Sequence, residues 1–265
     1  MAVAFKKHVL SNGIRVVAEE DPNAASAAVG FFVHSGARDE PADVMGISHL
    51  LEHMVFKGTA QRSGEEIDAA FDDLGVHHNA WTSHEITAFH AHGLPDVLKP
   101  ALTILADIMR PALRESDLED ERAVVLEEIA MYEDQPFWQL WEAVSENYFA
   151  GDPMGHRVLG TVDTVSSIDA QTMQSWHADR YVTENTVLAM AGQLDFEEVC
   201  AHLESLIGHW PGGGVTRVCK PHQPASDHLT IESDRVSAGY MLSVAPAPAL
   251  QDEDRHAAAV LAWLF

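Results

Sequence analysis

The chain has 265 residues, 46% of them hydrophobic and 22% charged, which is ordinary globular composition and enough for a large core. There are 41 acidic and 16 basic residues, and the formal net charge of -25 makes nucleic acid a poor partner. Two cysteines are too few for a disulfide framework, and no signal peptide or membrane-spanning apolar run is seen. We therefore expect a soluble, cytoplasmic protein that has no membrane or nucleic-acid partner.

The first 110 residues predict strands, then helices, then a second pair of strands. Asn12-Gly13 is a strong hairpin signal between two strand-like runs. Ser63 starts a capping box for a helix that ends near Gly75. The predicted strands are residues 6–10, 14–19, 26–34, 76–82 and 85–92, and the predicted helices are residues 46–56, 63–75 and 95–110.

The middle of the chain is mostly helical in pattern. Ser116-Asp117-Leu118-Glu119 is a second capping box, which predicts the start of a long helix that ends near Glu133. The next predicted helix begins at Pro136 and carries an aromatic stripe, which is more typical of a core than of a peptide-binding wall. A loop over 150–165, a helix over 167–180, a strand over 186–191 and a helix over 196–207 follow. Without a regular βαβ rhythm, this order favours an α+β fold with a largely antiparallel sheet covered by helices.

The Gly- and Pro-rich residues 209–227 indicate a linker that ends a domain over residues 1–208. Beyond it, residues 228–265 predict the beginning of a second domain, with strands over 228–233 and 238–244 and a helix from Asp252. An apolar, uncapped helix is an unusual terminus, so we expect the functional protein to be longer than this chain.

The run His49-Leu50-Leu51-Glu52-His53 is the most informative pattern. Two histidines four residues apart lie on one face of a helix and can bind one metal ion between consecutive turns. Glu52 points about 100° round the helix from His53, so it is placed to take a proton from zinc-bound water. The pattern H-x-x-E-H is found in zinc proteases and predicts peptide-bond hydrolysis. Taken alone, such a pattern is more often a set of solvated side chains on a helix surface than a metal site.

A catalytic zinc ion needs about three protein ligands and an open position for water. Glu121 and Glu128 are seven residues apart and therefore share one face of the long helix, whereas Glu127 points elsewhere. This stripe offers a third ligand at one end and, at the other, a carboxylate that orients a metal-bound histidine. A separate set of histidines is better explained as solvent-facing positions of an edge hairpin than as a second metal site: His77, His78, His84, His90 and His92.

Residues 46–59 resemble the active-site helix of the pitrilysin-type inverzincin metallopeptidases, the family that includes pitrilysin, insulin-degrading enzyme and the mitochondrial processing peptidases. The helix around Glu128 also resembles the family's third-ligand helix, at the expected distance along the chain. The resemblance implies that His49, His53 and Glu128 bind one zinc ion. It further implies that Glu52 is the catalytic base and that Glu121 supports the site.

Asn79-Ala80-Trp81-Thr82 resembles the family's edge strand, which pairs with an extended substrate, so Asn79 and Ala80 are expected to bind substrate. Residues 155–161 and 176–185 resemble further stretches of the family, although a His-Pro pair is replaced in the first. The implied fold is one half of a chamber. The implied partner is a second, similar half-domain, in cis or as the partner of a dimer or heterodimer.

The sequence thus predicts a zinc-dependent endopeptidase that hydrolyses extended peptides or unfolded polypeptides and needs a second half-domain for full activity. Two alternatives remain at this stage. One is a non-catalytic peptide-binding or assembly subunit of the same family. The other is metal storage or sensing on a histidine-rich acidic surface.

Overall fold

The computed structural model describes residues 2–217, 228–232 and 238–263, and a six-stranded sheet forms its centre. The strands lie in the order β1-β2-β6-β3-β5-β4. β2 and β6 run parallel, and every other neighbouring pair is antiparallel, which confirms the predicted α+β fold with a largely antiparallel sheet. The strands are β1 (Ala4–Val9), β2 (Arg15–Glu20), β3 (Ala27–Val33), β4 (His77–Thr82), β5 (Thr87–Gly93) and β6 (Thr186–Gly192).

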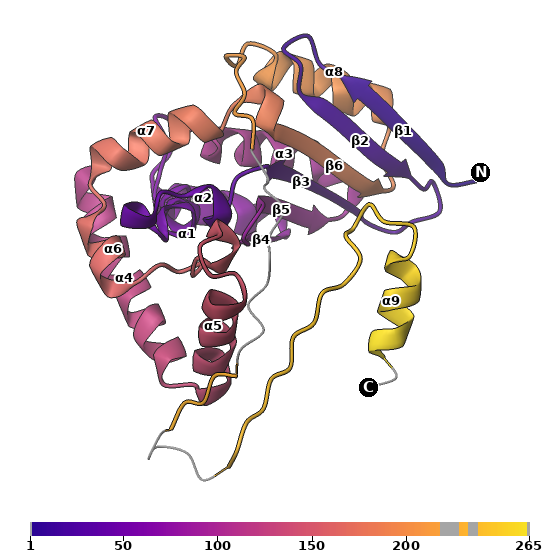
Figure 1. Cartoon of the computed structure of the whole chain (residues 1–265). Coiled ribbons are helices and arrows are strands. Elements are labelled where there is room, and N and C mark those ends of the chain that lie inside the picture. The colour runs from indigo at the N-terminus through magenta and orange to yellow at the C-terminus, as the bar shows by residue number, and fades with distance from the viewer. Residues whose placement is uncertain (1, 218–227, 233–237, 264–265) are drawn as a thin grey trace.

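Helices cover one face of the sheet and extend beyond one of its edges. α3 packs on β3 and β5, and α8 packs on β2. Figure 1 shows α8 above β1 and β2, whereas α4 to α7 lie beyond the β4 edge. The helices are α1 (Ile47–Met54), α2 (Gly64–Leu74), α3 (Leu98–Ile108), α4 (Glu115–Glu133), α5 (Pro136–Tyr148), α6 (Val162–Ser167), α7 (Ala170–Arg180), α8 (Phe196–Ile207) and α9 (Arg255–Ala262).

Side chains of alternate strand residues and of the helices form one core. β2 buries Val16 and Ala18 and leaves Arg15 exposed, which is the alternation expected of a strand with one covered face. The turn between β1 and β2 is the predicted hairpin, in which Gly13 has a φ of 94° that glycine adopts without strain. Phe31 and Phe89 are fully buried against the helices. The core therefore lies between the sheet and the helices that carry the candidate site.

Three local predictions in the middle of the chain differ from the structure in detail. The N-cap of α4 is Arg114, so Ser116 lies inside the first turn and forms no capping box; its hydroxyl contacts Asp117 instead. The helix predicted over 167–180 begins at Ala170 instead of Ser167, because Asp169 caps it by accepting a hydrogen bond from the backbone of Thr172. The loop predicted over 150–165 contains a 3-10 turn, Pro153–Gly155, and the beginning of α6.

The aromatic stripe of α5 is not a core, which corrects the preferred interpretation. Phe137, Trp138 and Trp141 are 48%, 40% and 43% exposed, and no residue of α5 is buried. α5 packs only at the periphery, against α4 and the turn Pro153–Gly155, and Figure 1 shows it away from the sheet. Helical periodicity alone does not distinguish a core face from a face beside a surface pocket.

The C-terminal segment shows one predicted element and lacks two others. α9 begins close to the expected position. Residues 228–232 and 238–244 form no strand, since no described segment pairs with them, and residue 233 lies outside the described residues. The linker prediction over 209–227 is described only to residue 217, where the chain has no regular structure. In the parts of the chain that the structure describes, no helix has the length and apolar character needed to cross a membrane.

Candidate metal and catalytic site

Helices α1 and α4 bring the predicted metal ligands together. His49 and His53 lie one turn apart on α1, and Glu128 faces them from α4. The Nε2 atoms of His49 and His53 each lie 3.7 Å from Oε2 of Glu128. The three candidate ligand atoms all lie within 4.8 Å of one another, whereas Glu127 is exposed and points away from them.

This arrangement fits a zinc ion. Bonds of about 2.1 Å in tetrahedral geometry would put ligand atoms about 3.4 Å apart, close to the two 3.7 Å distances from the histidines to Glu128. Burial, and next the neighbouring His53, lower the pKa of His49 to about 3, so this imidazole is neutral, which is the form that binds a metal. Two imidazoles and one carboxylate are a ligand set of catalytic zinc sites, with a fourth position open to water.

Glu121 holds the second histidine in place. Its Oε2 atom lies 3.1 Å from Nδ1 of His53, which leaves Nε2 of that ring facing Glu128. Lys57, just after α1, lies 2.5 Å from the other Glu121 oxygen and compensates the charge of this buried carboxylate. The sequence pattern predicts Glu121 but not Lys57, because nothing in the spacing of an isolated lysine indicates which carboxylate it will meet.

Glu52 faces the end of the edge strand. The hydroxyl of Thr82, the last residue of β4, donates a hydrogen bond of 2.5 Å to Oε2 of Glu52. Burial raises the pKa of Glu52, and the Thr82 hydrogen bond and the adjacent His53 oppose that rise. A carboxylate with a raised pKa is suited to accept and return a proton. Sequence reasoning placed Thr82 in the edge strand but did not find its contact with Glu52.

The predicted substrate residues lie on a free sheet edge. β4 is the last strand of the sheet, with Asn79 exposed and Ala80 half-buried along it. The side-chain oxygen of Asn79 accepts a hydrogen bond of 2.9 Å from the backbone of Ala80. The nearby histidines do not converge: His78 stacks on Phe71 with ring centroids 4.1 Å apart. Among the described residues, the only group with metal-ligand geometry is that of α1 and α4.

A buried carboxylate fixes the beginning of α1. Glu40 is 4% exposed and accepts hydrogen bonds from the backbone N–H groups of Gly46 at 2.7 Å and Ser48 at 2.8 Å. These are N–H groups that the helix itself leaves unpaired. Gly46 has a φ of 94°, and a Cβ atom there would lie 2.5 Å from the backbone oxygen of Leu159. The start of the metal helix is thus held from two sides, and neither contact is evident from the sequence.

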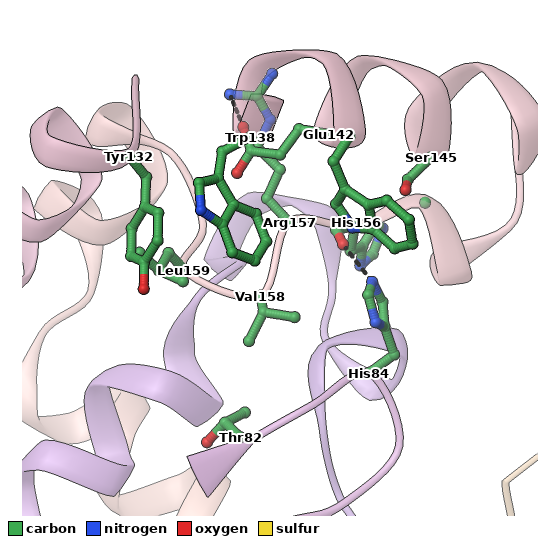
Figure 2. Close-up of a pocket in the computed structure, with 12 residues that line it drawn as sticks. Thr82, His84, Tyr132, Trp138, Glu142, Ser145, His156, Arg157, Val158 and Leu159 are labelled. Carbon is green, nitrogen blue, oxygen red and sulfur yellow. Dashed lines mark hydrogen bonds and ion pairs between the residues drawn. The ribbon is translucent and has the colours of Figure 1, made fainter. Parts of the chain in front are cut away.

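An aromatic cavity of about 220 Å³ opens beside Thr82. Figure 2 shows Tyr132 and Leu159 close together with Trp138 beside them, and Val158 between these rings and Thr82. Its other lining residues are His84, Trp141, Glu142, Ser145, Gly155, His156 and Arg157. This explains the exposure of two of the aromatic rings of α5, because Trp138 and Trp141 line a cavity instead of the core, whereas Phe137 lies outside the lining.

Sequence comparisons match the chain in two parts. A profile described as insulinase, peptidase family M16, matches residues 15–162, and one described as peptidase M16 inactive domain matches residues 167–265. The uncharacterized zinc protease YmxG of Bacillus subtilis is 36% identical over 82% of this chain and 53% of its own length. An uncharacterized zinc protease of Mycobacterium leprae is 40% identical over 75% of this chain and 45% of its own length. The chain spans about half the length of these relatives.

Solved structures share the fold at lower sequence identity. A protease from Helicobacter pylori superposes with a TM-score of 0.77 and 23% identity, over 83% of this chain and 54% of that protein. Pitrilysin superposes with a TM-score of 0.75 and 22% identity, over 84% of this chain and 24% of pitrilysin. At this identity the likeness concerns the fold.

Proposed function

The chain belongs to the insulinase family, peptidase family M16, and on this premise we propose that it carries the catalytic site of a zinc-dependent endopeptidase. The observation that carries the proposal is the convergence of His49, His53 and Glu128, with Glu52 on the same helix as the two histidines. The relatives named as zinc proteases support the metal and the reaction class.

Each site residue has a proposed role. His49, His53 and Glu128 hold one zinc ion, and Glu121 fixes the ring of His53. When bound, zinc would polarise the scissile carbonyl and make water a nucleophile near neutral pH. Glu52 accepts the proton of the attacking water and returns it to the leaving amine, while the hydroxyl of Thr82 orients this carboxylate.

The free edge of β4 supports extended peptides or unfolded polypeptides as substrates. A substrate strand that pairs with the backbone at Asn79 and Ala80 would gain main-chain hydrogen bonds without a demand on its side chains. The cavity beside Thr82 would accept one large apolar side chain of that strand, since tryptophan and tyrosine rings dominate its walls.

We further propose that full activity needs a second half-domain, in cis or from a dimer or heterodimer partner. The chain spans about half the length of its relatives, and the matched M16 inactive-domain profile reaches residue 265. In this proposal residues 1–208 form the catalytic domain, 209–227 the linker and 228–265 the beginning of the second domain. A comparison of peptide hydrolysis by this chain and by a protein of the relatives' length tests it, and robust cleavage by this chain alone would contradict it.

The roles are tested by separating zinc binding from turnover. Glu52→Gln keeps every metal ligand, so it should bind zinc stoichiometrically and lose peptidase activity by about 10²–10⁴-fold. Glu128→Gln should lose zinc, whereas Glu127→Gln, its exposed neighbour, should retain both zinc and activity. Metal analysis of the dialysed proteins and a fluorogenic peptide assay measure the two properties.

Two outcomes would change the conclusion. If Glu52→Gln cleaved peptides at near-normal rates, Glu52 would not be the base. If the longer protein bound zinc stoichiometrically and hydrolysed no peptide, the alternative of a non-catalytic peptide-binding or assembly subunit would be favoured.

A further inference from the structure

Arg217 is nearly buried although the segment around it is exposed. It lies at the end of residues 211–217, which follow α8 without regular structure, and 9% of its side chain is exposed. Its Nε atom donates a hydrogen bond of 2.8 Å to Oδ1 of Asp39, and its Nη2 atom donates another to Oδ2. The side chain of Asp39 is 4% exposed, so this is a buried arginine–carboxylate pair joined by two hydrogen bonds.

The same guanidinium group reaches a second loop. Nη2 of Arg217 donates a hydrogen bond of 2.7 Å to the backbone oxygen of Glu85, in the turn between β4 and β5. Asp39 lies in the 3-10 turn Ala37–Asp39, and two backbone hydrogen bonds already join the two loops. These bonds run from the N–H of Ala37 to Ser83 at 3.1 Å and from that of Arg38 to His84 at 2.9 Å. Arg217 therefore clamps two loops together.

Each clamped loop continues directly into a residue of the candidate site. Glu40 follows Asp39 and accepts the hydrogen bonds from Gly46 and Ser48 that cap α1. Thr82 precedes the β4–β5 turn and donates its hydroxyl to Glu52. One side chain from beyond α8 thus contacts both of the segments that fix the metal helix and the proposed base.

We propose that Arg217 is a positioning residue, which fixes the beginning of α1 and the end of β4 relative to one another. The role in catalysis rests on the proposed function of the site, whereas the contact between the two loops does not depend on it. It also gives residues 211–217 a role, because the segment that leaves α8 becomes part of the support of the active site.

The charges around Asp39 explain why the clamp depends on Arg217. The other cation near this carboxylate, Arg180, approaches Oδ1 only to 3.8 Å. Without Arg217, the Asp39 carboxylate keeps the backbone N–H of Gly36, 3.0 Å from Oδ2, but among the described residues its only remaining cation is the distant Arg180. The backbone oxygen of Glu85 also loses its hydrogen bond from the guanidinium group. The two loops should then open locally, while the core between the sheet and α8 contains neither residue and should stay closed.

Hydrogen exchange of single backbone amides in the metal-free 265-residue chain tests the clamp. Arg217→Ala should speed exchange at Ala37, Arg38, Gly46 and Ser48 by at least about tenfold. Amides within α8 should change less than about twofold. The matched control is Arg255→Ala, because the side chain of this arginine bonds the backbone of Asp252 in the C-terminal segment and should change none of these rates.

The outcomes distinguish this inference from the proposed function, because exchange needs neither zinc nor activity. Unchanged exchange at Gly46 and Ser48 in Arg217→Ala would overturn the inference, and so would an equal rise throughout α8. Arg217→Lys keeps the positive charge but cannot donate the paired hydrogen bonds of a guanidinium group. Compared with Arg217→Ala, it should restore part of the protection of these amides from exchange. In a peptidase-active protein of the relatives' length, Arg217→Ala should lower kcat by about tenfold with KM unchanged, and a change in KM alone would contradict a positioning role.

Discussion

The pH dependence of stability should report the ionisation of Glu40. This carboxyl group is 4% exposed, and burial raises its pKa to about 7 against the hydrogen bonds from Gly46 and Ser48, which lower it. In the unfolded chain the pKa returns to about 4.5. Between these two values the folded protein binds more protons than the unfolded one, so stability falls as pH rises, and it levels off above about pH 7.

The expected magnitude follows from the two pKa values. From pH 5 to pH 8, the contribution of Glu40 to the free energy of unfolding should fall by about 2.5 kcal/mol. In Glu40→Gln the side chain does not ionise. Its single amide oxygen accepts a hydrogen bond from one of the two N–H groups and leaves the other without this partner. The variant should therefore be less stable than the wild type at pH 5 and should lose that disadvantage at pH 8.

Urea unfolding of the metal-free wild type and of Glu40→Gln at pH 5 and pH 8 measures this difference. All other titrating groups are common to both proteins, so their effects cancel in the comparison. An equal stability difference at both pH values would refute the reasoning. If the wild type instead became more stable relative to the variant as pH rises, the N–H donors of α1 would stabilise the charged carboxylate by more than burial destabilises it.

Two further predictions use matched pairs of residues. Gly46 and Gly13 both have a φ of 94°, but only Gly46 faces a backbone atom, the oxygen of Leu159. Gly13→Ala should cost about 1–2 kcal/mol from backbone strain, and Gly46→Ala at least about 2 kcal/mol more, in thermal or urea unfolding; equal costs would contradict the close crossing. Trp138→Ala should reduce kcat/KM for peptides with a large apolar side chain by at least about tenfold, with zinc content unchanged. Phe137 is an exposed neighbour outside the cavity lining, so Phe137→Ala should leave kcat/KM unchanged. A similar loss in both variants would show that the cavity does not bind the substrate side chain.

Local sequence spacing was sufficient to predict which site residues share a face when those residues belong to one helix. The four-residue step from His49 to His53 places both rings on one side of α1, and the seven-residue step from Glu121 to Glu128 does the same on α4. The alternating strands and the hairpin at Gly13 likewise depend on near neighbours in the chain. These features are set by helix and strand periods, so they are predictable without knowledge of the tertiary structure.

Contacts between distant segments were not predictable in this way. Thr82 meets Glu52, and Lys57 meets Glu121, only because β4 and α4 pack against α1. Ser116 has the right neighbours for a capping box, but the helix begins earlier in the chain, at Glu115. The cytoplasmic location inferred from the cysteine content stays a prediction, which cell fractionation can test.

The position of β6 has a consequence for synthesis of the protein. This strand, Thr186–Gly192, pairs with β2 on one side and β3 on the other, although both of those strands lie within the first 33 residues. A growing chain therefore leaves one edge of β2 and one edge of β3 unpaired until residue 192 has left the ribosome. Pairing across so long a sequence separation is slow, so the nascent chain is exposed to aggregation until β6 has been made and paired. Both candidate metal helices emerge during that interval, before the sheet beneath them is complete.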